Sequence, residues 1–126
     1  MTRVLVVAEH DGARLDAATA KCVSCALELK PDALAVAVLA AGGADVAARA
    51  ARLHGVTQVV HVDAPHNATP LAAILAPQLA SLASGFTHLL GPSSTFGKDL
   101  LPRVAALLGV GQVSDVLAVA GPHRFR

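Results

Sequence analysis

The feature that most constrains the fold is an alternation of short apolar runs with amphipathic stripes. The predicted strands lie at residues 4–8, 33–39, 59–62, 86–91 and 112–119. The first is an unbroken apolar run, which is typical of a strand buried on both faces of a parallel sheet. Between them, apolar residues recur every three or four positions, as in helices that pack one face on a core. Strict alternation predicts an α/β fold, a three-layer sandwich with helices on both faces of a mainly parallel twisted sheet and right-handed crossovers.

Four helices are predicted between the strands. The apolar stripes of the first three are Leu15, Ala18, Cys22, Cys25, Ala26 and Leu29; then Val46, Ala50 and Leu53; then Leu71, Ile74, Leu75, Leu79 and Leu82. Pro31 and Gly55 should end the first two helices. Thr69 should cap the third ahead of Pro70, and Pro77 should kink it. Asp63, Pro65 and Asn67 mark a loop before it.

The start of the fourth helix, within residues 93–108, has two possible positions. If Asp99 is the N-cap, Pro102 falls in the first turn, where its missing N–H has no consequence. If Thr95 is the cap, Pro102 lies inside a longer helix and kinks it. Both alternatives stay open at the level of sequence.

Composition is that of one globular domain. A chain of 126 residues matches a single domain, and 54% hydrophobic residues can fill its core. Three Phe are the only aromatic residues and the net charge is +1, so stacking surfaces and a basic footprint for nucleic acid are both missing. We expect residues 1–120 to form the domain. Residues 121–126 turn polar and irregular, which marks a boundary.

Targeting signals are not apparent in the sequence. The start lacks a charged segment followed by an apolar one, and no apolar stretch approaches the roughly 18 residues that would span a bilayer. An Arg-rich transit peptide is also missing. We therefore expect a cytoplasmic, bacterial protein without membrane insertion.

The Gly97-Lys98 pair resembles a phosphate-binding loop but fails on spacing. A Walker loop has four residues between its first Gly and its Gly-Lys, whereas five separate Gly91 from Gly97 here. Asp99 takes the place of the magnesium-binding Ser or Thr, and its carboxylate would repel phosphates. We expect at most a mild anion-attracting spot, formed by free backbone N–H groups around Gly97 and by the Lys98 side chain. The alternative is that Lys98 is merely solvated.

Cys22 and Cys25 form a C-x-x-C motif, which can be a redox pair when it opens a helix. Both lie at least one turn into a predicted helix, on its apolar stripe, so we interpret them as packing residues. A zinc site would need a second pair of ligands.

Histidines and acids gather after two predicted strands. The six histidines are His10, His54, His61, His66, His88 and His123. The segments 9–11 (Glu-His-Asp) and 63–66 both follow strands, and ligands of open parallel sheets gather at such ends. No metal-binding His spacing or nucleophile motif accompanies them. We therefore assign no catalytic, cofactor-binding or metal-binding residue.

Three motifs together resemble a known family. They are Val-Leu-Val-Val-Ala-Glu-His-Asp at 4–11, Ser-Ser-Thr-Phe-Gly-Lys-Asp-Leu-Leu-Pro-Arg-Val-Ala-Ala-Leu-Leu at 93–108, and Gln-Val-Ser-Asp-Val at 112–116. In this order they resemble the amino-terminal domain of the electron transfer flavoprotein alpha subunit, over the whole chain. In that family the alpha subunit continues into a second domain, so residues 121–126 would begin the connection to a flavin domain that this chain lacks.

The resemblance implies a fold, a role and partners. The fold is of the adenine nucleotide alpha-hydrolase and universal stress protein type. The family forms a heterodimer that carries electrons from acyl-CoA-type dehydrogenases of fatty acid beta-oxidation to a membrane quinone oxidoreductase. FAD is held by the second alpha domain, AMP by the beta subunit, and the amino-terminal domain is a scaffold that pairs with the beta subunit. It is not an enzyme in itself, and we expect it to bind neither FAD nor AMP.

Two other functions remain as alternatives. The first is a free-standing adenine-nucleotide-binding domain like the universal stress proteins, although the glycine-rich array of their ATP-binding members is absent from residues 91–111. The second is a thiol redox protein that uses Cys22 and Cys25. For the scaffold role, interface candidates are the fourth helix and its preceding loop, with Thr95, Lys98 and Arg103, and the terminal arm from Gly121.

Overall fold

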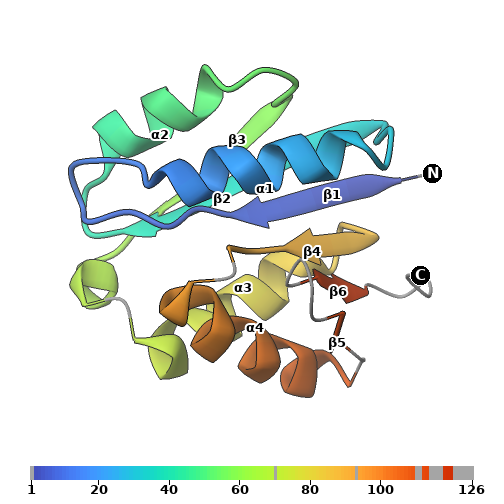
Figure 1. Ribbon diagram of the computed structural model, residues 1–126. Helices are drawn as coiled ribbons and strands as arrows, with labels where there is room; N and C mark the ends of the chain where they lie inside the picture. The colour runs from blue at the N-terminus through green and yellow to red at the C-terminus, as the bar shows by residue number, and fades with distance from the viewer. Residues whose placement is uncertain (1, 70, 93, 110–111, 114–117, 121–126) are drawn as a thin grey trace.

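A single mixed sheet forms the centre of the computed structural model, which describes residues 2–69, 71–92, 94–109, 112–113 and 118–120 (Figure 1). Its strands are β1 (Arg3–Val7), β2 (Ala33–Ala40), β3 (Gln58–Asp63), β4 (His88–Leu90), β5 (Gln112–Val113) and β6 (Ala118–Ala120). They lie in the order β3-β2-β1-β4-β6-β5. The first four are mutually parallel, which confirms the mainly parallel sheet.

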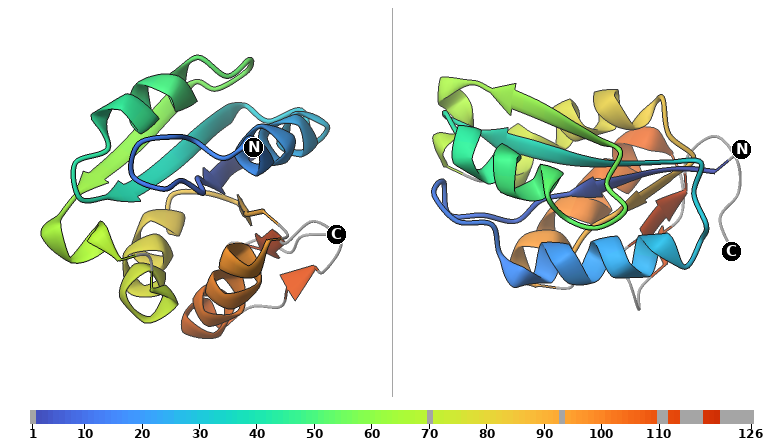
Figure 2. Two further views of the ribbon diagram at one scale, coloured as in Figure 1. Left: turned by 60° about the vertical axis from the view of Figure 1, so that its left-hand side comes forward. Right: turned by 90° about the horizontal axis from the view of Figure 1, so that it is seen from above.

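Helices cover both faces of this sheet, as the sequence predicts (Figure 2). Helices α1 (Ala17–Leu27) and α2 (Ala44–Ala51) lie on one face, and α3 (Ala72–Ala83) and α4 (Thr95–Leu108) on the other. Side chains alternate between the faces along β1: Val4 and Val6 pack with α1 and α2, whereas Leu5 and Val7 pack with α3 and α4. Each such fully buried aliphatic side chain contributes about 1.5–3 kcal/mol.

Gly91 marks a close approach directly after β4. A Cβ at this position would lie 2.9 Å from Cγ1 of Val7 and 2.8 Å from Cδ2 of Leu101. Only glycine lets the backbone pass between β1 and α4 here without displacing those side chains. The end of β4 is thereby held against the end of β1, which sets the position of the candidate site.

The predicted fifth strand is wrong. Instead of one strand at 112–119, the structure has two short strands, β5 and β6, paired antiparallel to each other. β6 also pairs antiparallel with β4. Ser114 and Asp115 interrupt the apolar pattern of 112–119, and both are residue types that favour turns, so the sequence carries a signal of a break that the single-strand prediction overlooks.

Two predicted helix boundaries also differ from the structure. Helix α1 begins at Ala17, because Asp16 is its N-cap and accepts from the Ala18 N–H, so Leu15 lies before the helix. Helix α2 ends at Ala51, before Leu53. Gly55 nevertheless has the left-handed backbone that its role as a helix terminator implies, with φ at +88°.

The region before α3 is more structured than a loop. A short 3-10 helix, η1 (Pro65–Ala68), replaces part of it, and the N-cap of α3 is Leu71 and not Thr69. Leu71 was expected to face inward, but it is 53% exposed because it lies outside the helix. Pro77 lies within α3, as predicted.

For α4, neither alternative for the N-cap is correct. Ser94 is the cap, its side chain accepts from the Gly97 N–H, and Thr95 is the first helical residue. Pro102 therefore lies inside the helix. Within the described residues, no helix is both long and apolar enough to cross a membrane.

Candidate functional site

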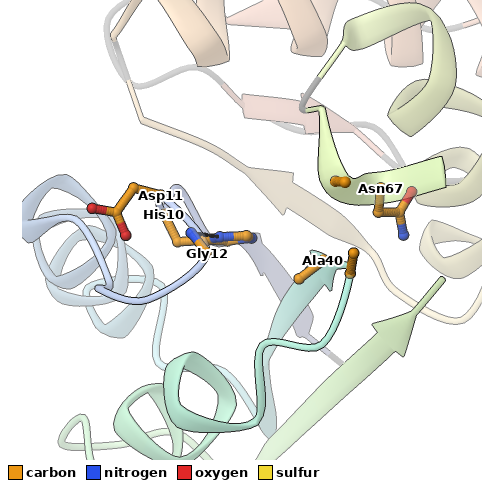
Figure 3. A pocket seen from close by; sticks show the side chains of 7 residues that line it. His10, Asp11, Gly12, Ala40 and Asn67 are labelled. Carbon is orange, nitrogen blue, oxygen red and sulfur yellow. Dashed lines mark hydrogen bonds between the residues drawn. The ribbon is translucent and has the colours of Figure 1, made fainter. Parts of the chain in front are cut away.

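The carboxyl ends of β1, β2 and β4 meet at one edge of the sheet. The chain moves outward from β1 through β2 to β3 and then returns to the other side of β1 as β4, so β1 and β4 flank the switch point where ligands of such sheets gather. A cleft of about 190 Å³ opens beside it (Figure 3). Its lining is His10, Asp11, Gly12, Ala40, Ala41, Asn67 and Ala68.

His10 has partners on both ring nitrogens. Its Nδ1 accepts the Gly12 N–H at 3.0 Å, so the ring proton belongs on Nε2, which donates to the Leu39 carbonyl at 2.9 Å. In Figure 3 the ring lies next to Gly12 and across the cleft from Asn67. The imidazole thus holds the loop after β1 against β2, and both of its ring nitrogens are engaged by backbone groups.

Asp11 serves the same loop. Its Oδ1 accepts the N–H groups of Ala13 and Arg14 at 2.9 and 2.7 Å. These two hydrogen bonds, first that from Arg14, lower the pKa of the Asp11 carboxyl. The carboxylate is exposed but its bonds organise a turn, which explains an acid here without any chemistry.

Glu9 lies at the switch point itself. Its Oε1 accepts the Ser94 hydroxyl proton at 2.6 Å, across 85 positions of sequence. The Ser94 Oγ in turn accepts the Gly97 N–H at 3.4 Å. The expectation of a free N–H at Gly97 is therefore wrong, because the Ser94 side chain accepts it, and the Glu9 carboxylate lies next to this cap.

Asp63 and His61 act on the turn after β2. Asp63 accepts the Gly42 N–H at 2.6 Å, and the His61 Nε2 bonds to the Gly42 carbonyl. His66 is exposed on η1. The two polar segments do meet at one edge of the sheet, as predicted, but their described contacts secure turns.

The sequence does not predict that two polar residues at this edge are buried. Asn67 is 3% exposed and exchanges two hydrogen bonds with Gln78 on α3, at 3.1 and 2.7 Å. Thr19, fully buried on α1, accepts the Glu9 N–H at 3.0 Å. The burial of Asn67 and Thr19 cannot be read from the sequence, because each side chain makes its hydrogen bond with a residue of another element.

The cysteines are packing residues, as predicted. Both are free thiols, Cys22 being buried against β1 and β2 and Cys25 partly buried at the edge of the same cluster. Burial, with smaller contributions from Cys25 and Glu9, raises the pKa of Cys22 to about 11. This thiol is therefore almost fully protonated at neutral pH, the opposite of a redox-active cysteine.

The remaining candidates lie apart from the cleft. His88 on β4 bonds to the Thr87 hydroxyl, and burial lowers the pKa of its imidazole. His54 is exposed beyond α2, and His123 lies outside the described residues. Among the residues that the structure describes, no three His, Cys, Asp or Glu side chains are grouped so as to hold a metal ion.

The interface candidates are solvent-facing. Thr95, Lys98 and Arg103 are all exposed on α4. Arg103 pairs with Asp99 at 3.6 Å, one helical turn away, and both side chains are more than half exposed at 55% and 61%. Such an exposed pair contributes little to stability and leaves the guanidinium accessible to a partner. The terminal arm from Gly121 lies outside the described part of the chain.

Comparison with known proteins gives one consistent result. The family model described as electron transfer flavoprotein domain matches residues 4–124. A Pseudomonas aeruginosa protein named electron transfer flavoprotein subunit alpha is 42% identical over 98% of this chain and 40% of its own length. A Bradyrhizobium diazoefficiens protein of the same name is 42% identical over 96% of the chain and 38% of its own length.

A mitochondrial relative matches as well. The Dictyostelium discoideum protein named electron transfer flavoprotein subunit alpha, mitochondrial, is 36% identical over 97% of this chain and 36% of its own length. The chain thus spans about two fifths of the length of the curated relatives it matches. None of these names favours the universal stress protein alternative.

Proposed function

Because this chain belongs to the electron transfer flavoprotein family, as the amino-terminal domain of its alpha subunits, we propose that it is the scaffold domain of a heterodimeric electron carrier. In this role it pairs with the beta subunit and supports a flavin domain that binds FAD. The complete carrier accepts electrons from acyl-CoA-type dehydrogenases and passes them to a quinone oxidoreductase. The domain contributes no catalytic site of its own.

The observation that carries the proposal is the carboxylate at the switch point. In a nucleotide-binding sheet of this type, phosphates lie against a helix N-terminus at that crevice. Here Glu9 bonds to the cap residue of α4, at 2.6 Å from its hydroxyl. A phosphate at the same place would face like charge at short range, so nucleotide binding is disfavoured where the fold would otherwise offer it. The proposal therefore assigns FAD and AMP to the other parts of the heterodimer.

The surface of α4 is the proposed contact with the beta subunit. Arg103 offers a planar cation on an exposed helix face, and arginine is enriched at interfaces. Leu107, one turn further along, is 58% exposed and is one of two large hydrophobic side chains so exposed among the described residues. An arginine beside an exposed leucine gives this face the mixed character of a partner-binding surface.

Two measurements test the proposal. The purified chain is titrated calorimetrically with FAD, AMP and ATP, and no saturable binding is expected; stoichiometric flavin or adenylate in the isolated chain would contradict the scaffold role. In the second, the chain is mixed with the beta subunit of the same organism, and a one-to-one complex is expected.

A matched pair of variants tests the face. Arg103→Ala should weaken the complex, whereas Arg52→Ala, at the exposed end of α2 on the opposite face, should not. Equal effects of the two substitutions would rule out α4 as the contact. A cytoplasmic, bacterial location is part of the proposal and stays a prediction, since the relatives include bacterial and mitochondrial proteins.

A further inference from the structure

Strands β1 and β4 are paired over a short stretch only. The register joins Val4 to His88, Leu5 to Leu89 and Val6 to Leu90. At the amino end, the Thr87 hydroxyl adds two bonds to Arg3, accepting its N–H and donating to its carbonyl, each at 2.9 Å. Beyond Leu90 the sheet pairing stops, so the course of the chain from β4 into α4 depends on other contacts.

A side-chain hydrogen bond between Ser94 and Glu9 joins the start of α4 to the segment after β1, in addition to the packing around Gly91. Glu9 is itself held firmly: its N–H donates to Thr19, and its carbonyl accepts the Asp16 N–H at 2.8 Å. Its carboxylate therefore projects from a rigid turn. A hydrogen bond to an ionised acceptor is among the stronger ones, so this contact can set the position of Ser94.

Ser94 in turn controls the first turn of α4. Its hydroxyl caps Gly97, and its carbonyl accepts the Lys98 N–H at 2.8 Å. The hydroxyl has a single proton. Because Ser94 donates it in a hydrogen bond to Glu9, the lone pairs of Oγ point towards the helix. The exposed side chains of Thr95 and Lys98 project from this same turn.

We propose that Glu9 is a positioning residue, which orients the Ser94 cap and thereby presents the first turn of α4 to the partner subunit. The proposal rests on the scaffold function proposed above for its partner, while the contact itself depends on this chain alone. Glu9 would act through Ser94, without touching the partner or any cofactor.

Hydrogen exchange tests the contact in the isolated chain. Glu9→Ala should speed exchange of the Gly97 and Lys98 amides by about ten- to a hundredfold, since a hydrogen bond to a charged group is lost. Glu9→Gln retains a neutral acceptor and should give a smaller increase. The control is Asp11→Ala, which removes a neighbouring acid that contacts Ala13 and Arg14 but not α4. Unchanged exchange at the two amides in Glu9→Ala would overturn the proposal.

A double-mutant cycle tests the consequence for the partner. Dissociation constants for the beta subunit are measured for Glu9→Ala, Ser94→Ala and the double variant, with the free energy of unfolding followed in parallel. We expect at least a fivefold loss of affinity in Glu9→Ala and little further loss from Glu9→Ala once Ser94 is absent. The positioning role would be refuted if the two substitutions changed affinity independently of each other. It would also be refuted if Glu9→Ala left affinity unchanged while exchange of the Gly97 and Lys98 amides became faster. Either result would leave the scaffold function standing. Failure of the unaltered chain to bind would instead refute the scaffold function, while the exchange measurement still decides the contact.

Discussion

Alkaline destabilisation through Cys22 is the prediction that the structure allows us to work out most fully. Burial raises the pKa of this thiol from its usual 9.0 to about 11 in the folded protein. In the unfolded chain the thiol ionises near its usual value. Between these two values the unfolded state binds fewer protons than the folded state, so stability must fall as pH rises through this window.

The size of the effect follows from the difference between the two pKa values. Each pKa unit corresponds to about 1.36 kcal/mol, so the thiol should remove about 2–3 kcal/mol of stability between pH 9 and pH 11. Other groups titrate there too, and they are subtracted by using Cys22→Ala as the reference. The chain has no Tyr, so tyrosine ionisation does not add to the signal.

The assay is urea unfolding of the unaltered chain and of Cys22→Ala at a series of pH values. The difference in unfolding free energy should be constant below pH 8 and shrink by about 2–3 kcal/mol towards pH 11. Cys25→Ala serves as the control, because Cys25 lies only partly buried. A difference that does not change with pH would show that Cys22 is not desolvated as the packing indicates.

The same burial predicts chemical inertness. With a pKa of about 11, roughly one Cys22 in ten thousand is a thiolate at pH 7, about a hundredfold less than for a thiol at 9.0. Alkylation by iodoacetamide in the folded chain should therefore be at least about a hundredfold slower than in urea. Reaction of Cys22 within a factor of three of the unfolded rate, or ready formation of a disulfide with Cys25, would revive the thiol redox alternative.

Two further predictions concern one histidine and two glycines. Burial lowers the pKa of His88 below its usual 6.5, so folding favours the neutral imidazole. The free energy of unfolding should therefore fall as pH drops below about 6.5. Urea unfolding of His88→Gln should not show this loss of stability at acid pH. Gly55 and Gly12 both have left-handed backbones, at +88° and +94°, but a Cβ on Gly55 would lie 2.5 Å from Leu27 whereas one on Gly12 meets nothing within 4 Å. Both substitutions to Ala should cost about 1–2 kcal/mol for the backbone, with about 1 kcal/mol more at Gly55; equal losses of stability would show that Leu27 moves aside freely.

The sequence predicts where the polar segments of the site lie, but it does not predict which partners their side chains bind. The segments after the first and third strands were expected at one edge of the sheet because the carboxyl ends of parallel strands share an edge. That inference needs only periodicity. The partners of these side chains could not be derived, since Glu9 meets Ser94 across 85 positions and Asn67 meets Gln78 on a different helix.

The error at the start of α4 has an identifiable cause. Ser, Asp and Thr are all good N-caps, so a sequence such as Ser94-Thr95 followed by Asp99 offers several starts of similar local energy. The bond from Glu9 favours Ser94 over the others, and that is a tertiary contact. In the same way, the antiparallel pairing of β6 with β4 is a contact between distant segments, which the local sequence does not specify.

By itself, the sequence determined the layers, because the period of apolar residues along the chain specifies which segments are strands and which are helices independently of their neighbours. It also carried the motifs that identify the family. Only the tertiary structure decided which polar groups already have hydrogen-bond partners within the protein. Hydrogen bonds are short and directional, so whether Glu9, His10 or Gly97 is available to a ligand depends on atoms that only the fold brings within 3.5 Å.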